Sequence, residues 1–181
     1  MRWKRGAQAP QFAVQDVFGE MRSLADYRGK NLLLSFFRYS SCAICNLRIH
    51  HLIDRYEAWR QRGLEILAVF ESPRDNVVSN VNKQSVPFPL IADPEARLYD
   101  LFGVENSEER VTAAPGNPSR LQGQILAARD LGYPLQREEG GNFFRMPADF
   151  LIGPDGTMTQ AFYSEEIGSH LSFEEIEKVL C

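Results

Sequence analysis

The fold is decided by residues 32–52, LLLSFFRYSSCAICNLRIHHL. An unbroken apolar run, a short polar turn and a segment with helical apolar spacing follow one another here, which predicts a strand, a loop and a helix. Cys42 and Cys45 stand at the start of the predicted helix. The unpaired N–H groups and the positive dipole end of a first helical turn stabilise an anion, and cysteines of a CxxC pair at such positions have depressed pKa values. The stretch therefore predicts a reactive dithiol at a helix N-terminus.

The composition narrows the class of protein further. The chain has 181 residues, 44% of them hydrophobic, which fits one domain with a substantial core. Its formal net charge is -4, so no basic surplus indicates nucleic acid or an anionic membrane as a partner. Three cysteines, an odd number, do not form a framework of structural disulfides, and a CxxC in a reducing compartment is more often catalytic or metal-binding. Redox chemistry is therefore the first expectation.

The segment that precedes the predicted core bears on the compartment. Residues 1–6 are basic like the start of a secretory signal, but residues 7–11, AQAPQ, stand where the apolar part of such a signal is required. Elsewhere the sequence offers no uncharged apolar run of the length that spans a bilayer. We therefore expect a cytoplasmic protein without membrane contact.

The hydrophobic pattern of the remaining chain predicts the elements around this turn. Apolar strands over 31–37 and 64–70 are joined by the helix that starts at Cys42, which implies a right-handed crossover and parallel pairing. Strands over 143–152 and 158–163 flank a Gly-Pro-Asp-Gly turn and predict an antiparallel hairpin. The other expected elements are a hairpin over 9–24, helices over 73–84, 94–102, 119–131 and 172–180, and a short strand within 86–93.

This order of elements predicts an α/β protein. A mixed central sheet with helices on both faces, in three α/β/α layers, buries the apolar strands, and the hairpin over 9–24 covers it as an N-terminal extension. Residues 104–142 are the least regular part, with loops around one possible helix. We interpret them as an insertion before the penultimate strand, within a single domain of residues 1–181.

The order also resembles the thioredoxin fold, because a CxxC leaves the first long strand and Pro147 begins the penultimate one. Within that superfamily the chain resembles the AhpC/TSA-type peroxiredoxin-like proteins over nearly its whole length. The motifs that carry this resemblance are Ala9-Pro10-Gln11-Phe12, Leu24 to Lys30, Phe36-Phe37-Arg38, Phe88 to Pro94, and Phe150 to Gly156. It implies a thiol-disulfide oxidoreductase with an antioxidant, peroxide-reducing role and no cofactor. It also implies a thiol reductant such as thioredoxin or glutathione, with a homodimer as a possible assembly.

The resemblance has two halves that assign the cysteines differently. In the peroxiredoxin register Cys45 is the peroxidatic position, Cys42 replaces a threonine and Arg38 replaces a proline. Thioredoxin-like proteins carry the CxxC intact, with the first cysteine attacking and the second resolving, beside a cis-proline at the position that Pro147 matches. The resemblance thus implies Cys42, Cys45 and Pro147 as site residues, with a cis bond before Pro147.

The chemistry of the pair admits both orders of attack. Disulfide exchange needs a thiolate, partial exposure and a second thiol that breaks the mixed disulfide, which makes Cys42 the attacker and Cys45 the resolver. In a peroxide scheme Cys45 attacks the O–O bond, becomes a sulfenic acid and condenses with Cys42. Protein disulfide reduction is therefore the alternative to peroxide reduction, and a buried, inert pair is the structural alternative to both.

Cations near the sulfurs favour the thiolate. Arg38 precedes the cysteines in the loop and is our candidate site residue of this kind, while Arg48 follows Cys45 by about one turn. A solvated surface position is the equal alternative for both. Arg145 and Asp149 flank Pro147 and face the site only if the strand pleat directs them there.

An alternative of another class is a non-catalytic metal-binding or interaction protein on the same fold. Zinc could take both cysteines together with His50 and His51. Both histidines continue the same helix, however, and cannot converge on the two thiols without breaking it, so a surface or partly buried pair is favoured. We expect Cys181 to be an exposed terminal thiol, with a resolving role toward a partner subunit as the alternative.

Overall fold

A five-stranded mixed sheet forms the centre of the structure, a computed structural model that describes residues 1–180. The strand order is β5-β4-β3-β6-β7. The bounds are β3 Asn31–Phe36, β4 Leu64–Phe70, β5 Leu90–Ala92, β6 Ala148–Ile152 and β7 Met158–Tyr163. β3 to β5 pair in parallel, whereas β6 is antiparallel to both of its neighbours. The apolar run of β3 thus forms the central strand, as predicted.

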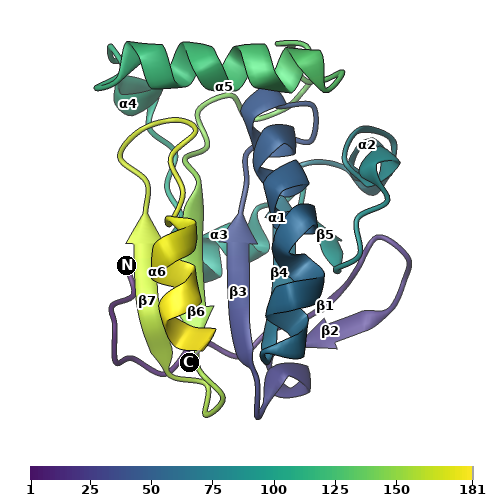
Figure 1. Ribbon diagram of the computed structural model, residues 1–181, viewed down its shortest axis with the longest axis vertical. Helices are drawn as coiled ribbons and strands as arrows, with labels where there is room; N and C mark the ends of the chain where they lie inside the picture. The colour runs from purple at the N-terminus through teal and green to yellow at the C-terminus, as the bar shows by residue number, and fades with distance from the viewer. Residues whose placement is uncertain (181) are drawn as a thin grey trace.

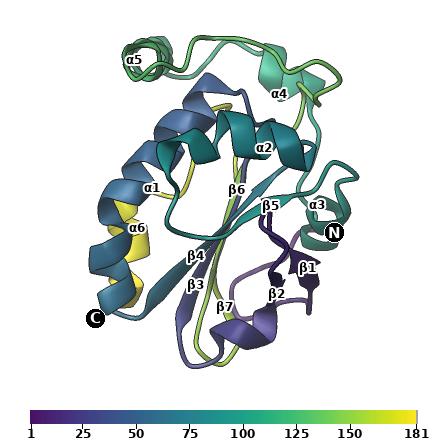
Figure 2. The ribbon, with the colours of Figure 1, turned by 90° about the vertical axis from the view of Figure 1, so that its right-hand side faces the viewer.

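Helices cover both faces of this sheet, which gives three layers (Figures 1 and 2). One face packs on α1 (Ala43–Gln61), α2 (Arg74–Asn80) and α6 (Phe173–Glu177), and the other on α3 (Arg97–Phe102). Alternation along β3 explains the two cores, because Leu33 belongs to the first and Leu32 and Leu34 to the second. The predicted thioredoxin fold is therefore confirmed.

The N-terminal hairpin is formed by β1 (Ala13–Gln15) and β2 (Met21–Ser23), and a 3-10 turn over Leu24–Tyr27 follows it. Phe12, Leu24 and Tyr27 bury their side chains in the core on the α3 side. The predicted hairpin is confirmed, and it covers the face of the sheet opposite to α1 (Figure 2).

The predicted insertion contains α4 (Glu108–Thr112) and α5 (Pro118–Asp130). α5 lies across the N-terminal end of α1 (Figure 1). Ala43 and Leu47 of α1 pack with Ala128 of α5 and with Tyr133, which follows it. The insertion therefore meets the rest of the chain at the turn that carries the cysteines.

Several element boundaries differ from the sequence-based prediction. α2 ends at Asn80, before the predicted end at residue 84, and a separate 3-10 turn over Asn82–Gln84 follows it. α3 begins at Arg97, later than the predicted start at residue 94. The Asp93 carboxylate accepts hydrogen bonds from the backbone N–H groups of Arg97 and Leu98, and so pairs the first N–H groups of a helix that begins there. β6 begins at Ala148 because the residues before it pair with the insertion instead. Ser107 donates its N–H to the Phe144 carbonyl, and Met146 donates to Glu105.

The C-terminal part follows the prediction with one change. The Ser172 hydroxyl accepts a hydrogen bond from the Glu175 N–H and caps α6, and the last turn, Lys178–Leu180, is a 3-10 helix. The expectation for Cys181 lies outside the described residues. In residues 1–180, no helix has both the length and the apolar character that a membrane crossing requires.

Candidate active site

The two cysteines lie where the loop after β3 enters α1. Cys42 is the N-cap residue of α1 and Cys45 lies in its first turn. Asn46 holds the loop in place, because its side-chain amide donates to the carbonyls of Ser40 (2.8 Å) and Cys42 (3.1 Å). The geometry of the dithiol turn therefore depends on a buried asparagine that the sequence pattern did not single out.

Cys42 and Cys45 are not joined by a disulfide, and each cysteine is only 4% exposed. A hydrogen bond from the Cys45 thiol stabilises the Cys42 thiolate, and the positive charge of Arg38 and the N–H groups of Cys45 and Ile44 add to it. Together they outweigh burial and lower the pKa of Cys42 to about 6. Burial raises the pKa of Cys45 well above its ordinary value, and the hydrogen bond that it donates to Cys42 acts in the same direction. The two thiols therefore differ in acidity, and Cys42 is the one that becomes the thiolate more readily.

Arg38 is buried beside the thiols. One of its terminal nitrogens donates to the Phe143 carbonyl, and its guanidinium carbon lies 5.2 Å from the ring centre of Tyr39 and 4.9 Å from that of Phe143. Among residues 1–180, no carboxylate forms an ion pair with it within 4.0 Å. The structure therefore brings the predicted cation to the cysteine turn with its charge available to the thiolate.

Removing this cation is expected to raise the pKa of Cys42. In an Arg38→Met variant the midpoint of iodoacetamide alkylation should move from about pH 6 toward the ordinary thiol value of about 8.5. The rate should be followed from pH 5 to 9 with Cys42 identified by peptide mass spectrometry, and Arg48→Met serves as the control. An unchanged midpoint in Arg38→Met would show that helix geometry and Cys45 alone hold the thiolate.

Cys42 opens into a pocket of about 410 Å³ under α5. The lining residues come from the cysteine turn, from the insertion and from the loop after β7; they are Arg38, Tyr39, Cys42, Ala43, Ile44, Leu121, Ile125, Leu135, Gln136, Arg137, Phe143 and Ile167. Access to Cys42 is therefore through a recess of small-molecule size rather than across a flat surface.

The loop after β7 packs tightly against α1 and α5 at Gly168. This residue has a φ of +73°, and a Cβ built on it would lie 2.9 Å from Cγ2 of Ile44 and 3.0 Å from Oε1 of Gln124. Gln124 of α5 also donates to the Gly168 carbonyl at 3.1 Å. Only glycine fits this conformation and this space without strain.

The structure corrects the expectation for Pro147. The bond between Met146 and Pro147 is trans, as are the other peptide bonds of the described residues. The Met146 N–H donates to the Glu105 carbonyl at 3.0 Å, and the Pro147 carbonyl accepts from the Ser164 N–H at 3.1 Å. These hydrogen bonds hold both residues in place with the trans peptide bond, which is the intrinsically favoured isomer. Pro147 precedes Ala148, which pairs with Phe36 at the end of β3, so Pro147 lies near the end of the sheet that carries the cysteine loop. It does not line the Cys42 pocket.

Arg48 and Asp149 belong to a different buried cluster. The Arg48 guanidinium donates to the Leu171 carbonyl at 2.6 Å and lies over the Phe173 ring. Nδ1 of His170 lies 3.0 Å from an Asp149 oxygen. Burial raises the pKa of Asp149, but the charge and hydrogen bond of His170, with Arg48 and the Ser35 hydroxyl, lower it to about 2. This cluster holds the C-terminal segment on the sheet and does not contact the thiols.

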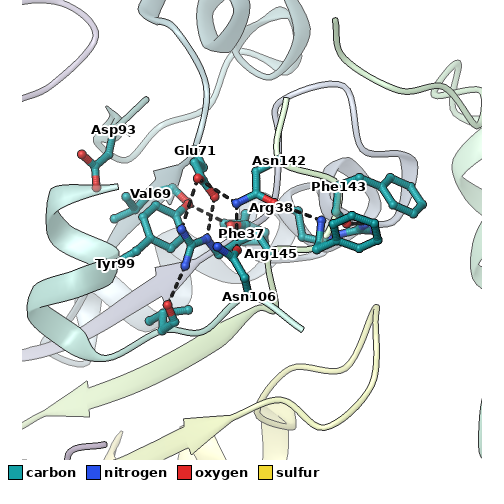
Figure 3. Close-up of polar contacts among 12 residues, drawn as sticks. Phe37, Arg38, Val69, Glu71, Asp93, Tyr99, Asn106, Asn142, Phe143 and Arg145 are labelled. Carbon is teal, nitrogen blue, oxygen red and sulfur yellow. Dashed lines mark hydrogen bonds and ion pairs between the residues drawn. The ribbon is translucent and has the colours of Figure 1, made fainter. Parts of the chain in front are cut away.

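Arg145 lies at the other side of the cysteine loop, in a network with Glu71 at the end of β4 (Figure 3). Nε of Arg145 is 2.5 Å from a Glu71 carboxylate oxygen, and Nη1 donates to the Val104 carbonyl at 2.6 Å. Asn142 donates to the same carboxylate at 3.0 Å, and the Glu71 backbone N–H donates to Arg38. The network therefore connects the cysteine loop, β4 and both ends of the insertion.

His50 and His51 lie on α1 with partly exposed side chains. His50 faces Asp54 at 3.7 Å, and the His51 ring packs on Phe173. In the part of the chain that the structure describes, no three His, Cys, Asp or Glu side chains form a group that could hold a metal ion.

Comparison with solved structures places the fold in a known class. The peroxidoxin BcpB from Mycobacterium tuberculosis matches with a TM-score of 0.68 and 15% identity, over 99% of this chain and 95% of that one. The thioredoxin domain of a thiol-disulfide oxidoreductase from Bacteroides vulgatus matches with a TM-score of 0.61 and 15% identity, over 99% of each chain. The protein is therefore a thioredoxin-fold protein with a CxxC at the head of its first long helix.

Comparison of sequences gives the family. The model of the AhpC/TSA family matches residues 5–161, so the chain belongs to this family. The thiol-disulfide oxidoreductase ResA of Geobacillus thermodenitrificans is 31% identical over 100 residues, which are 55% of this chain and 57% of that relative. The protein of the same name from Bacillus subtilis is 29% identical over 100 residues, 55% of each chain. The chain thus spans little more than half the length of these curated relatives.

Proposed function

We propose that the protein is a thiol oxidoreductase that reduces small peroxides through a dithiol/disulfide cycle of Cys42 and Cys45. The observation that carries the proposal is the asymmetry of the pair. Cys42, at the N-cap of α1, has a pKa lowered to about 6, whereas the pKa of Cys45 is raised well above its ordinary value. A nucleophile and a protonated resolving thiol one turn apart are what such a cycle requires.

The chemistry follows from these two protonation states. The Cys42 thiolate attacks one peroxide oxygen, the O–O bond breaks, and the departing oxygen takes a proton and leaves as an alcohol or water. Cys42 is then a sulfenic acid. The Cys45 sulfur attacks the sulfur of Cys42, the hydroxyl leaves with a proton as water, and a disulfide forms. Two electrons from the dithiol thereby reduce one peroxide.

Two observations support a small substrate. Cys42 is only 4% exposed, and it is reached through a pocket of about 410 Å³ beneath α5. A hydroperoxide can enter such a recess, whereas a disulfide on a folded protein requires a more accessible sulfur. Arg38 supports the same step, because its charge favours the thiolate before the attack.

Protein disulfide reduction is the second candidate. The names of the ResA relatives favour it, as does the order of attack, since Cys42 is the first cysteine of the CxxC. In either case the oxidised pair needs an external thiol reductant such as thioredoxin or glutathione. A cytoplasmic location would supply both reductants and would keep the resting pair reduced.

The test is a single oxidation of the reduced protein. One equivalent of hydrogen peroxide should convert it within seconds to a form in which peptide mass spectrometry finds a bond between Cys42 and Cys45. Insulin reduction in the presence of dithiothreitol measures the second candidate on the same preparation. If treatment with hydrogen peroxide leaves both cysteines as free thiols and no sulfenic acid can be trapped, the proposed cycle is overturned.

A further inference from the structure

The pocket beside Cys42 has a largely apolar wall. Its aliphatic side chains come from α1, the insertion and the loop after β7; they are Ile44, Leu121, Ile125, Leu135 and Ile167. Leu135 is 69% exposed at the rim, where no other part of the described chain covers it. Exposed leucine next to an apolar recess is typical of a surface that a ligand covers.

Two guanidinium groups stand in the same pocket. Arg38 and Arg137 both line it, and neither forms an ion pair with a carboxylate within residues 1–180. The Arg137 guanidinium carbon lies 3.7 Å from the centre of the Phe143 ring, and Arg38 approaches the same ring. An aromatic ring orients these cations but does not neutralise them.

The acidic residue next to Arg137 in the chain does not line the pocket. Glu138 instead faces the cysteine loop, where one of its oxygens accepts hydrogen bonds from the backbone N–H (3.1 Å) and the hydroxyl of Ser40, and the other is buried without a hydrogen-bond partner. Arg38 is buried beside the Cys42 thiol, whereas Arg137 is exposed at the pocket. Among residues 1–180, no carboxylate lies within ion-pair distance of Arg137, so its guanidinium is available to an anionic ligand.

We propose that this pocket binds an unbranched apolar chain that ends in a carboxylate. The chain lies along Leu121, Ile125 and Leu135, and the carboxylate binds the guanidinium of Arg137, a pairing that two parallel hydrogen bonds stabilise. A peptide-like ligand fits less well, because the aliphatic wall offers few partners for its amide groups. Where the proposed function holds, the substrate class is a carboxylated alkyl hydroperoxide, and it leaves as the corresponding alcohol.

The test uses a non-reactive probe, dodecanoate, below its micelle concentration. Isothermal titration of the reduced protein should show one site, and Arg137→Gln should weaken its affinity by about tenfold, the order of magnitude of one charge-assisted hydrogen bond. Arg129→Gln is the matched control, because Arg129 is an exposed arginine near the end of α5 that pairs with Asp130. It should leave the affinity unchanged.

Two further arms make each outcome decisive. Because dodecanol lacks the charge, it should bind the wild-type protein about tenfold more weakly than dodecanoate does. To Arg137→Gln the two probes should bind with equal affinity. Cys45→Ser, at a residue that does not line the pocket, should retain dodecanoate binding although it cannot form the disulfide, which separates the pocket from the redox cycle. Absence of dodecanoate binding, or equal binding by Arg137→Gln, overturns this inference whether or not the protein reduces peroxide. Binding by a protein that peroxide does not oxidise overturns only the proposed function.

Discussion

Replacing Cys42 by serine is expected to abolish the reduction of hydrogen peroxide, with a loss in kcat/KM of about a thousandfold or more. Serine keeps the shape of the side chain but does not ionise near neutral pH, so the anionic nucleophile at the N-cap of α1 is lost. Peroxide consumption with dithiothreitol as the reductant measures the effect. Thermal unfolding of the variant should match that of the wild type, because the fold does not depend on the charge.

The Cys45→Ser variant is the matched comparison. It keeps Cys42 at the N-cap, so it should still react with one equivalent of peroxide and accumulate a sulfenic acid that dimedone traps at Cys42. It should fail only in forming the internal disulfide. The opposite pattern, with the first oxidation lost in Cys45→Ser and kept in Cys42→Ser, would instead establish the peroxiredoxin register, in which Cys45 attacks.

Replacing Arg145 by methionine is expected to lower the free energy of unfolding by about 3–5 kcal/mol, the range for breaking one partner of a buried ion pair. Glu71, whose side chain is 11% exposed, would remain buried without its cation. Methionine fills most of the volume of the arginine stem, so the lost charge dominates the change. Urea unfolding followed by circular dichroism measures it.

A surface pair provides the control for this experiment. Arg97 and Glu95 form an ion pair in which both side chains are largely exposed, and Arg97→Met should change the unfolding free energy by no more than about 1 kcal/mol. If Arg145→Met were as mild as Arg97→Met, the network of Figure 3 would have no special part in stability.

The core of the fold could be predicted because its signals are local. Two such signals are the apolar run of β3 and the helical apolar spacing after Cys42. Each involves residues that are close together in the sequence, and both elements formed as expected. The Ser172 cap could be predicted for the same reason, since capping joins residues three apart. In each case the residues that determine the structure are neighbours in the sequence.

The surroundings of the thiols depend on contacts between distant residues. Glu71 and Arg145 are separated by 74 positions, and nothing in either segment indicates that they pair. Likewise, the sequence places Arg38 and Arg48 equally near the cysteines, but only Arg38 lies beside them, because Arg48 reaches the Leu171 carbonyl. The isomer at Pro147 was expected from resemblance, and the local hydrogen bonds of this chain follow a different geometry.

The close packing at Gly168 bears on how α5 is held beside the Cys42 pocket. Gly168 lies against Ile44, and its carbonyl accepts a hydrogen bond from Gln124, so α5, the loop after β7 and the first turn of α1 meet at this one residue. A displacement of α5 away from the cysteine turn would break this contact. The position of one wall of the pocket therefore depends on a residue that has no side chain.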